Sequence, residues 1–137
     1  MKVFIDTSSL FKKYHFEEGT KKFFDILKDV SAIVVSPITY LEITNTAFRL
    51  YHQSKISKGE LELLSKAINH DFQYFEQMPW NKDLENFCFH WMNSHHIKTL
   101  DLIQLACAQH TKCQRFITSD KNQYKIAKKE MKDVLFI

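Results

Sequence analysis

The sequence predicts an α/β fold in which a mostly parallel sheet carries helices on both faces. Three observations predict it: short β-branched or aromatic runs alternate with helical stretches, the run at 2–5 ends at an aspartate, and so does the run at 115–119. Strands and helices that alternate along a chain form right-handed crossovers, which place helices on both faces of a parallel sheet. A functional site is then expected beyond the carboxyl ends of the strands.

The first half of the chain shows strong strand and helix signals. After the first strand, Thr-Ser-Ser is expected to cap a helix that begins near Ser9. Pro37 stands where a helix can start, and Ser57 with Glu60 forms a capping-box pattern. The expected elements are strands at 2–5 and 32–35, and helices from near Ser9 and over 17–28, 38–52 and 57–75.

The second half repeats the alternation. Asn81 is expected to cap a helix, and Thr99 to cap another whose body is apolar almost all round, which is typical of a helix packed into the core. A lysine-rich helix follows Asp120. The expected elements are an edge strand near 77–80, helices at 81–95, from Thr99 and up to about Lys132, and strands at 115–119 and 134–136.

Length and composition favour one globular domain over residues 1–137. The 45% of hydrophobic residues can form a core, and two glycines and two prolines leave no sign of a linker. The N-terminal residues leave no room for a signal peptide, and no stretch approaches a membrane span. Three cysteines, an odd number, favour reduced thiols, so we expect a cytoplasmic protein. The net charge of +3 permits a polyanionic partner without predicting one.

Four acids could converge in one cleft: Asp6 after the first strand, Glu42 on a helix, Asp101 in the first turn of the core helix and Asp120 after a later strand. Packed carboxylates repel one another, and a hard divalent cation that takes oxygen ligands relieves the repulsion. Mg²⁺ or Mn²⁺ fits such a site. The cation can activate water and stabilise the charge of an in-line attack on a phosphodiester, so the pattern predicts a nuclease.

Each acid also has a simpler interpretation. Asp101 can stabilise a helix N-terminus, Asp120 with Gln123 can form a capping pair, Glu42 can be a solvated helix residue and Asp6 can begin a turn. Their joint placement favours the catalytic interpretation.

The sequence resembles the PIN-domain family, and within it the ribonuclease toxins of VapBC-type toxin–antitoxin pairs. The resemblance spans nearly the whole chain. It rests on four short motifs in order: Val-Phe-Ile-Asp6-Thr-Ser-Ser-Leu, Tyr-Leu-Glu42-Ile-x-Asn, Thr-Leu-Asp101-Leu-Ile-Gln-Leu-Ala-Cys-Ala and Phe-Ile-Thr-Ser119-Asp120-Lys.

The resemblance implies a three-layer α/β/α fold and an endoribonuclease cleft that uses Mg²⁺ or Mn²⁺. It implies that Asp6 and Asp101 are the most direct metal ligands, with Asp120 and Glu42 completing the ligand and water shell. Hydroxyl contacts from Thr7 and Ser119 are an alternative to their ordinary role in turns. Relatives often carry arginine just before the third acid, whereas this chain has Lys98 three residues ahead. An RNA substrate, an antitoxin partner and a homodimer follow from the same resemblance.

Three further features admit two interpretations each. A lysine stripe shares one face of the last helix and is either a solvated face or an RNA contact. Three histidines near Cys88 match no zinc spacing, which favours surface histidines. Surplus phenylalanines fill the core or form a groove for a partner. The lysine stripe consists of Lys121, Lys125, Lys128 and Lys132. The histidines are His90, His95 and His96, and the phenylalanines near the N-terminal helices are Phe11, Phe16, Phe23 and Phe24.

Two other functions fit part of the pattern. A haloacid-dehalogenase-like phosphatase needs a second acid two residues after the first, and Ser8 stands there. The stronger alternative is a catalytically silent PIN-like module that binds RNA or protein. The presence of all four acids favours the nuclease.

Overall fold

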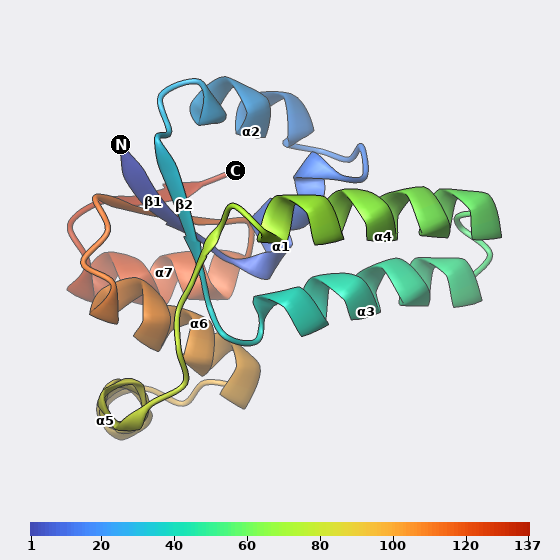
Figure 1. Cartoon of the computed structure of the whole chain (residues 1–137). Helices are drawn as coiled ribbons and strands as arrows, with labels where there is room; N and C mark the ends of the chain where they lie inside the picture. The colour runs from blue at the N-terminus through green and yellow to red at the C-terminus, as the bar shows by residue number, and fades with distance from the viewer.

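Five short strands form one sheet at the centre of the molecule (Figure 1). The computed structural model describes residues 1–137. The strand order is β3-β2-β1-β4-β5, and every neighbouring pair is parallel, which confirms the expected parallel sheet. The strands are β1 (Lys2–Ile5), β2 (Ala32–Val35), β3 (Glu76–Gln77), β4 (Arg115–Thr118) and β5 (Val134–Phe136).

Helices connect the strands and cover both faces of the sheet. None of them combines the length and hydrophobicity that a membrane crossing requires. They are α1 (Thr7–Leu10), the short 3₁₀ helix η1 (Phe11–Lys13), α2 (Thr20–Leu27), α3 (Thr39–His52), α4 (Lys58–Phe72), α5 (Lys82–Ser94), α6 (Thr99–His110) and α7 (Lys121–Glu130).

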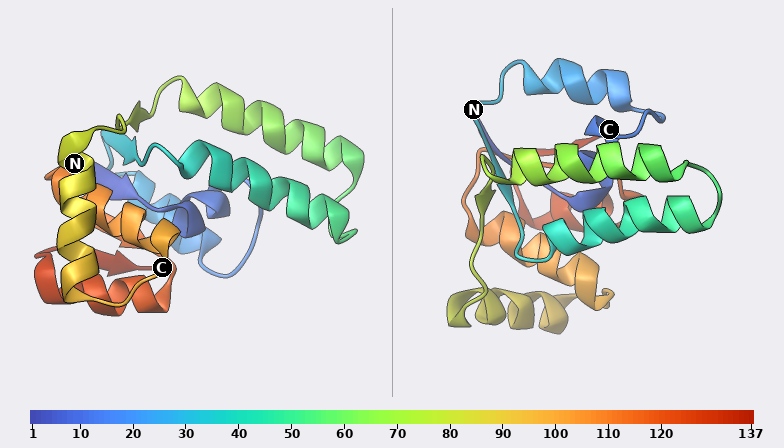
Figure 2. Two further views of the ribbon diagram at one scale, coloured as in Figure 1. Left: turned by 90° about the horizontal axis from the view of Figure 1, so that it is seen from below. Right: turned by 45° about the vertical axis from the view of Figure 1, so that its right-hand side comes forward.

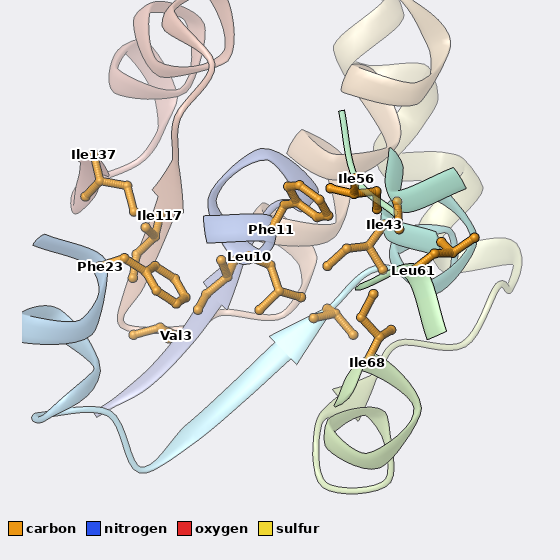
Figure 3. Close-up of a cluster of buried hydrophobic side chains, with 13 residues drawn as sticks. Val3, Leu10, Phe11, Phe23, Ile43, Ile56, Leu61, Ile68, Ile117 and Ile137 are labelled. Atoms are coloured by element: carbon orange, nitrogen blue, oxygen red, sulfur yellow. The ribbon is translucent and has the colours of Figure 1, made fainter. Parts of the chain in front are cut away.

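Alternating strand residues divide the core into two clusters, one on each side of the sheet. Val3 and Ile5 point to the side covered by α1, α2, α3 and α4, whereas Phe4 between them points to α5, α6 and α7. Figure 3 shows the first cluster, in which side chains from strands and helices point toward one another. The three-layer α/β/α architecture is therefore confirmed.

The strand order reverses direction next to β1. The chain passes from β1 to β2 on one side, whereas β4 pairs with β1 on the other side. A crevice at the carboxyl ends of β1 and β4 is the usual ligand site of such sheets. Asp6 directly follows β1, and Asp120 follows the end of β4 with only Ser119 between them, so both lie at this point.

Three helix starts differ from expectation. The first helix begins at Thr7 because Asp6, rather than the Thr-Ser-Ser run, caps it. Helix α2 begins at Thr20 instead of 17 because Gly19 before it has a left-handed backbone (φ 89°). Helix α6 begins at Thr99 with Lys98 as its cap residue, and no side chain caps it.

Helices α3 and α4 form a hairpin that extends beyond the sheet. In both views of Figure 2 the two helices run side by side, and the capping box of Ser57 and Glu60 opens α4 as expected. Strand β3 occupies 76–77 instead of 77–80, and α4 ends at Phe72. The hairpin places one face of α3 next to the crevice.

Candidate metal-binding active site

The four expected acids line one cleft of about 590 Å³. They come from different parts of the fold: Asp6 from the end of β1, Glu42 from α3, Asp101 from α6 and Asp120 from the start of α7. Helix α3 belongs to one layer of helices and α6 to the other, so the cleft opens where the two layers meet at the sheet edge. The fold therefore brings together residues that are up to 114 positions apart.

The Asp6 carboxylate is buried and accepts three hydrogen bonds. Its Oδ1 accepts hydrogen bonds from the Ser9 N–H (3.0 Å) and the Ser8 hydroxyl (2.8 Å), and its Oδ2 accepts one from the Thr118 hydroxyl (2.5 Å). Asp6 is 1% exposed, and burial raises its pKa to about 6 although these hydrogen bonds act in the opposite direction. The carboxylate is thus fixed in position, and no basic side chain forms an ion pair with it.

Glu42 is oriented by two donors from other elements. Its Oε1 accepts hydrogen bonds from the Thr7 hydroxyl and from Nε2 of Gln104, both at 2.7 Å. Gln104 Nε2 also lies 3.1 Å from the Thr7 hydroxyl oxygen. These bonds leave Oε2 of Glu42 available to a water molecule or an ion. Glu42 is therefore not simply a solvated residue on the surface of a helix.

Asp101 experiences the charge of its neighbours. Partial burial raises its pKa, and the nearby carboxylates of Asp120 and Glu42 raise it further, while Gln123 and Lys98 act in the opposite direction. Gln123 donates from Nε2 to Oδ1 of Asp101 at 3.2 Å. The like-charge repulsion that the sequence predicted is therefore present between these side chains.

Asp120 caps helix α7, as the simpler of its two interpretations predicts. Its Oδ1 accepts hydrogen bonds from the backbone N–H groups of Asn122 (2.8 Å) and Gln123 (3.0 Å) at the start of α7. Its Oδ2 accepts no hydrogen bond, so one oxygen holds the helix while the other is available to the cleft. The capping role and a ligand role are compatible.

None of the four carboxylates forms an ion pair with a lysine, arginine or histidine. As the side chains stand, nowhere in residues 1–137 do three acids, histidines or cysteines converge closely enough to enclose an ion. The donor set nevertheless fits a hard divalent cation, because it consists of carboxylate oxygens without partners of opposite charge. Binding would require rotation of side chains such as Asp101 and Asp120, which are only partly buried.

The sequence does not predict the roles of two glutamines in the cleft: Gln104 is not singled out, and Gln123 is expected only in a capping pair with Asp120. Gln104 follows Asp101 by one helical turn, and Gln123 follows Asp120 by the same spacing. Each donates its amide to a carboxylate of a different element, and each keeps a buried Oε1 without a partner. A carboxylate only accepts hydrogen bonds, which fixes the orientation of both amides. The available signal is Gln104 itself, the one polar residue within the buried run 102–108 of α6.

The two hydroxyl residues weighed beside the acids behave differently. Thr7 donates to Glu42 and lines the cleft. Ser119 instead contacts the Ser9 hydroxyl at 2.9 Å, and its backbone N–H donates to Ser8. Ser119 thus connects the end of β4 to α1, and its side chain forms no hydrogen bond to an acid of the cleft.

The sequence profile of the PIN domain matches residues 3–129. The chain belongs to the PIN-domain family. No curated protein sequence matches it. Among solved structures, this PIN domain is similar to VapBC-1 from nontypeable Haemophilus influenzae, with 17% identity, a TM-score of 0.73 and coverage of 99% of this chain and 98% of that chain.

Two further solved structures share the fold of this PIN domain. A toxin–antitoxin complex from Klebsiella pneumoniae has 18% identity and a TM-score of 0.71, and the match covers 97% of this chain and 95% of that chain. VapC20 from Mycobacterium tuberculosis, a toxin that cleaves the sarcin–ricin loop, has 12% identity and a TM-score of 0.68 over 90% and 94% of the two chains. At these identities the likeness establishes the fold alone.

Residues outside the cleft add detail on the remaining features. The expected stripe of four lysines is only partly on α7: those at 121, 125 and 128 are exposed on its surface, whereas Lys132 lies beyond its last residue, Glu130. His90 and His95 each approach Glu130, at 3.2 and 3.1 Å, and so connect the end of α5 to the end of α7. Phe11 and Phe23 are buried in the core, whereas Phe24 is exposed and Phe16 is 83% exposed.

Proposed function

We propose that this PIN domain is a Mg²⁺- or Mn²⁺-dependent endoribonuclease that hydrolyses RNA phosphodiester bonds. The observation that carries the proposal is the set of four carboxylates without ion-pair partners in one cleft at the reversal of strand order. Such a concentration of unpaired acids is costly unless a cation or a proton neutralises it. The resemblance of the four motifs to ribonuclease toxins supports the same function.

Asp6, Asp101 and Asp120 are the proposed metal ligands. When bound, the cation lowers the pKa of a water molecule and stabilises the negative charge that develops during in-line attack on phosphorus. Asp6 supplies the fixed carboxylate, because three hydrogen bonds hold it. Asp120 keeps its capping bonds through Oδ1 and offers Oδ2.

Glu42 is proposed to hold the attacking water. Glu42 lines the cleft, and Thr7 and Gln104 occupy one of its carboxylate oxygens while the other one, Oε2, accepts no hydrogen bond. Glu42 Oε2 can then accept a hydrogen bond from the water and receive its proton. Gln123 plays the corresponding part for Asp101 by fixing Oδ1.

We further propose that the chain is the toxin of a toxin–antitoxin pair and forms a homodimer. Similar folds in solved structures are part of complexes named as toxin–antitoxin assemblies. Phe16 and Phe24, which remain exposed near the N-terminal helices, supply apolar surface for a protein partner.

A cleavage assay tests the enzymatic proposal. Labelled single-stranded RNA is incubated with the purified chain in Mg²⁺, in Mn²⁺ and in EDTA, beside Asp6→Asn and Asp101→Asn. We expect cleavage by the wild type only with a divalent cation, and none by either variant, because a neutral amide does not balance the charge of the cation.

The same assay separates the alternative function. A catalytically silent module would bind RNA without cutting it under any metal condition. Cleavage that persists in EDTA, or that both variants retain, would remove the four acids from the mechanism.

A further inference from the structure

We propose that Arg49 binds an RNA phosphate adjacent to the phosphodiester bond that is cleaved. Arg49 lies on α3 seven residues after Glu42, that is, two helical turns or about 10 Å further along the same face. Both residues line the acid cleft, together with Asn45 and Thr46 between them. The inference rests on the proposed ribonuclease function and adds where the substrate strand runs.

Arg49 is the one basic residue that lines the cleft. A fifth acid, Glu17, also lines it and is already paired with Lys12 at 3.3 Å. An RNA strand that approaches this cleft is repelled by five carboxylates. A cation bound among four of them would neutralise only part of this negative charge. A positive side chain beside the acids is therefore needed to draw a polyanion in.

Arg49 is also the arginine that remains unpaired. The chain has two arginines, and the other, Arg115, binds Asp133 at 3.0 Å. Arg49 forms no ion pair and is exposed, although acids line the same cleft. A guanidinium presents a planar fork that matches two phosphate oxygens, which makes it a better phosphate ligand than lysine.

A simpler role for Arg49 exists and predicts a different result. Its position near the end of α3 allows it to stabilise the helix dipole. Loss of that role would lower the melting temperature of the free protein and leave RNA binding unchanged. Loss of a phosphate contact instead changes the salt dependence of RNA binding.

The test measures RNA binding in the Asp101→Asn background, in which the strand stays intact. Fluorescence anisotropy with a labelled single-stranded RNA gives the dissociation constant at several salt concentrations, for this parent and after adding Arg49→Gln, Arg49→Lys or Lys112→Gln. Lys112 is an exposed control in the turn before β4, so it lies toward the amino ends of the strands, whereas the cleft lies at their carboxyl ends.

We expect Arg49→Gln to reduce the slope of log affinity against log salt by about 0.7, the value for one phosphate contact with a single strand. Lys112→Gln should leave the slope unchanged, and Arg49→Lys should keep the slope while it weakens binding. In the cleavage-competent protein, Arg49→Gln should raise KM and keep kcat, since the contact exists before and during the reaction.

The possible failures are distinguishable. If the parent binds RNA, the wild type cleaves it and Arg49→Gln leaves the slope unchanged, the Arg49 proposal is wrong and the proposed function stands. If the parent binds no RNA and the wild type does not cleave, both are wrong.

Discussion

The hydroxyl of Thr118, the last residue of β4, donates a 2.5 Å hydrogen bond to Oδ2 of Asp6, the first residue after β1. The bond joins the two central strands at the point where the strand order reverses. It favours the ionised form of a carboxylate whose pKa burial raises to about 6. The position and the charge of the proposed metal ligand thus depend on a residue outside the acid set.

Thr118→Val should therefore destabilise the protein most where Asp6 is ionised. We expect the free energy of unfolding at pH 8 to fall by about 1.5–3 kcal/mol, the usual contribution of a hydrogen bond to a charged group. Denaturant titration measures it. Thr44→Val is the matched control, because the Thr44 hydroxyl bonds a backbone carbonyl at an exposed site, and its effect should stay within about 0.5 kcal/mol. Equal losses in the two variants would contradict the prediction.

The metal-free protein should lose stability as the pH rises from about 4 to about 6. The pKa of Asp6 is about 6 in the folded chain and has an ordinary value of 3.8, so the folded state binds the proton more tightly in this window. Above pH 6 the loss is complete, at up to about 3 kcal/mol. Asp6→Asn does not titrate here. In EDTA, its unfolding free energy relative to wild type should increase from pH 4 to pH 7, and a constant difference would refute the pKa assignment.

Asp101→Asn should melt at a higher temperature than the wild type in EDTA near pH 8. Its raised pKa reflects burial together with the charges of Asp120 and Glu42, and the neutral amide relieves both penalties. Mg²⁺ should then raise the melting temperature of the wild type far more than that of the variant. If Asp101 acted only on the helix dipole, the variant would instead lose about 0.3–1 kcal/mol with or without metal. A lower melting temperature in EDTA with a full Mg²⁺ shift would remove Asp101 from the site.

Gln104→Leu should separate activity from stability. The change removes the amide that orients Glu42 and also removes a buried oxygen without a hydrogen-bond partner. Loss of the hydrogen bond to the Glu42 carboxylate costs about 1.5–3 kcal/mol, and removal of the unsatisfied oxygen offsets most of it, so the free energy of unfolding should change little. Cleavage should fall by about 10–100-fold, as is usual when a residue that supports a metal site is replaced. Undiminished kcat in the variant would show that Glu42 needs no such support.

The lysines of α7 give a prediction about the RNA path. If Lys125 and Lys128 contact phosphates, the double change to Glu should lower the salt slope of RNA binding by about 0.7 for each lost contact with a single strand. Lys128 also lies over the Tyr124 ring, with 5.1 Å between Nζ and the ring centroid. An unchanged slope would assign both lysines to a solvated face.

Local signals in the sequence predicted the elements well and their exact starts less well. Ser57 and Asn81 cap the helices they were expected to cap, because a cap acts on N–H groups two or three residues away. The sequence predicts Asp6 as a site residue, whereas in the structure its Oδ1 also caps α1. The shift of α2 depends on the left-handed backbone of Gly19, which packs against Lys12 and the C-terminal residue.

The acids of the cleft could be predicted because strand ends and helix starts place them at one edge of the sheet. Of their supporting residues, the sequence indicated only Thr7, as one of two possible hydroxyl contacts. Gln104 and Gln123 act across elements, on Glu42 and Asp101, and such pairings depend on how α3, α6 and α7 pack. The sequence contains no local pattern for a contact between residues 62 positions apart.

The hydrogen bond between Gln104 and Glu42 crosses from one layer of helices to the other at the edge of the sheet. Elsewhere the strands separate the two apolar clusters, so each layer could open locally while the other stays folded. The cleft is complete only while both layers are in place. Partial unfolding of either layer of helices would therefore disrupt the cleft before the molecule as a whole denatures. An ion held by Asp6 and Asp101 would slow amide hydrogen exchange in α1 and α6 together, although these helices belong to different cores.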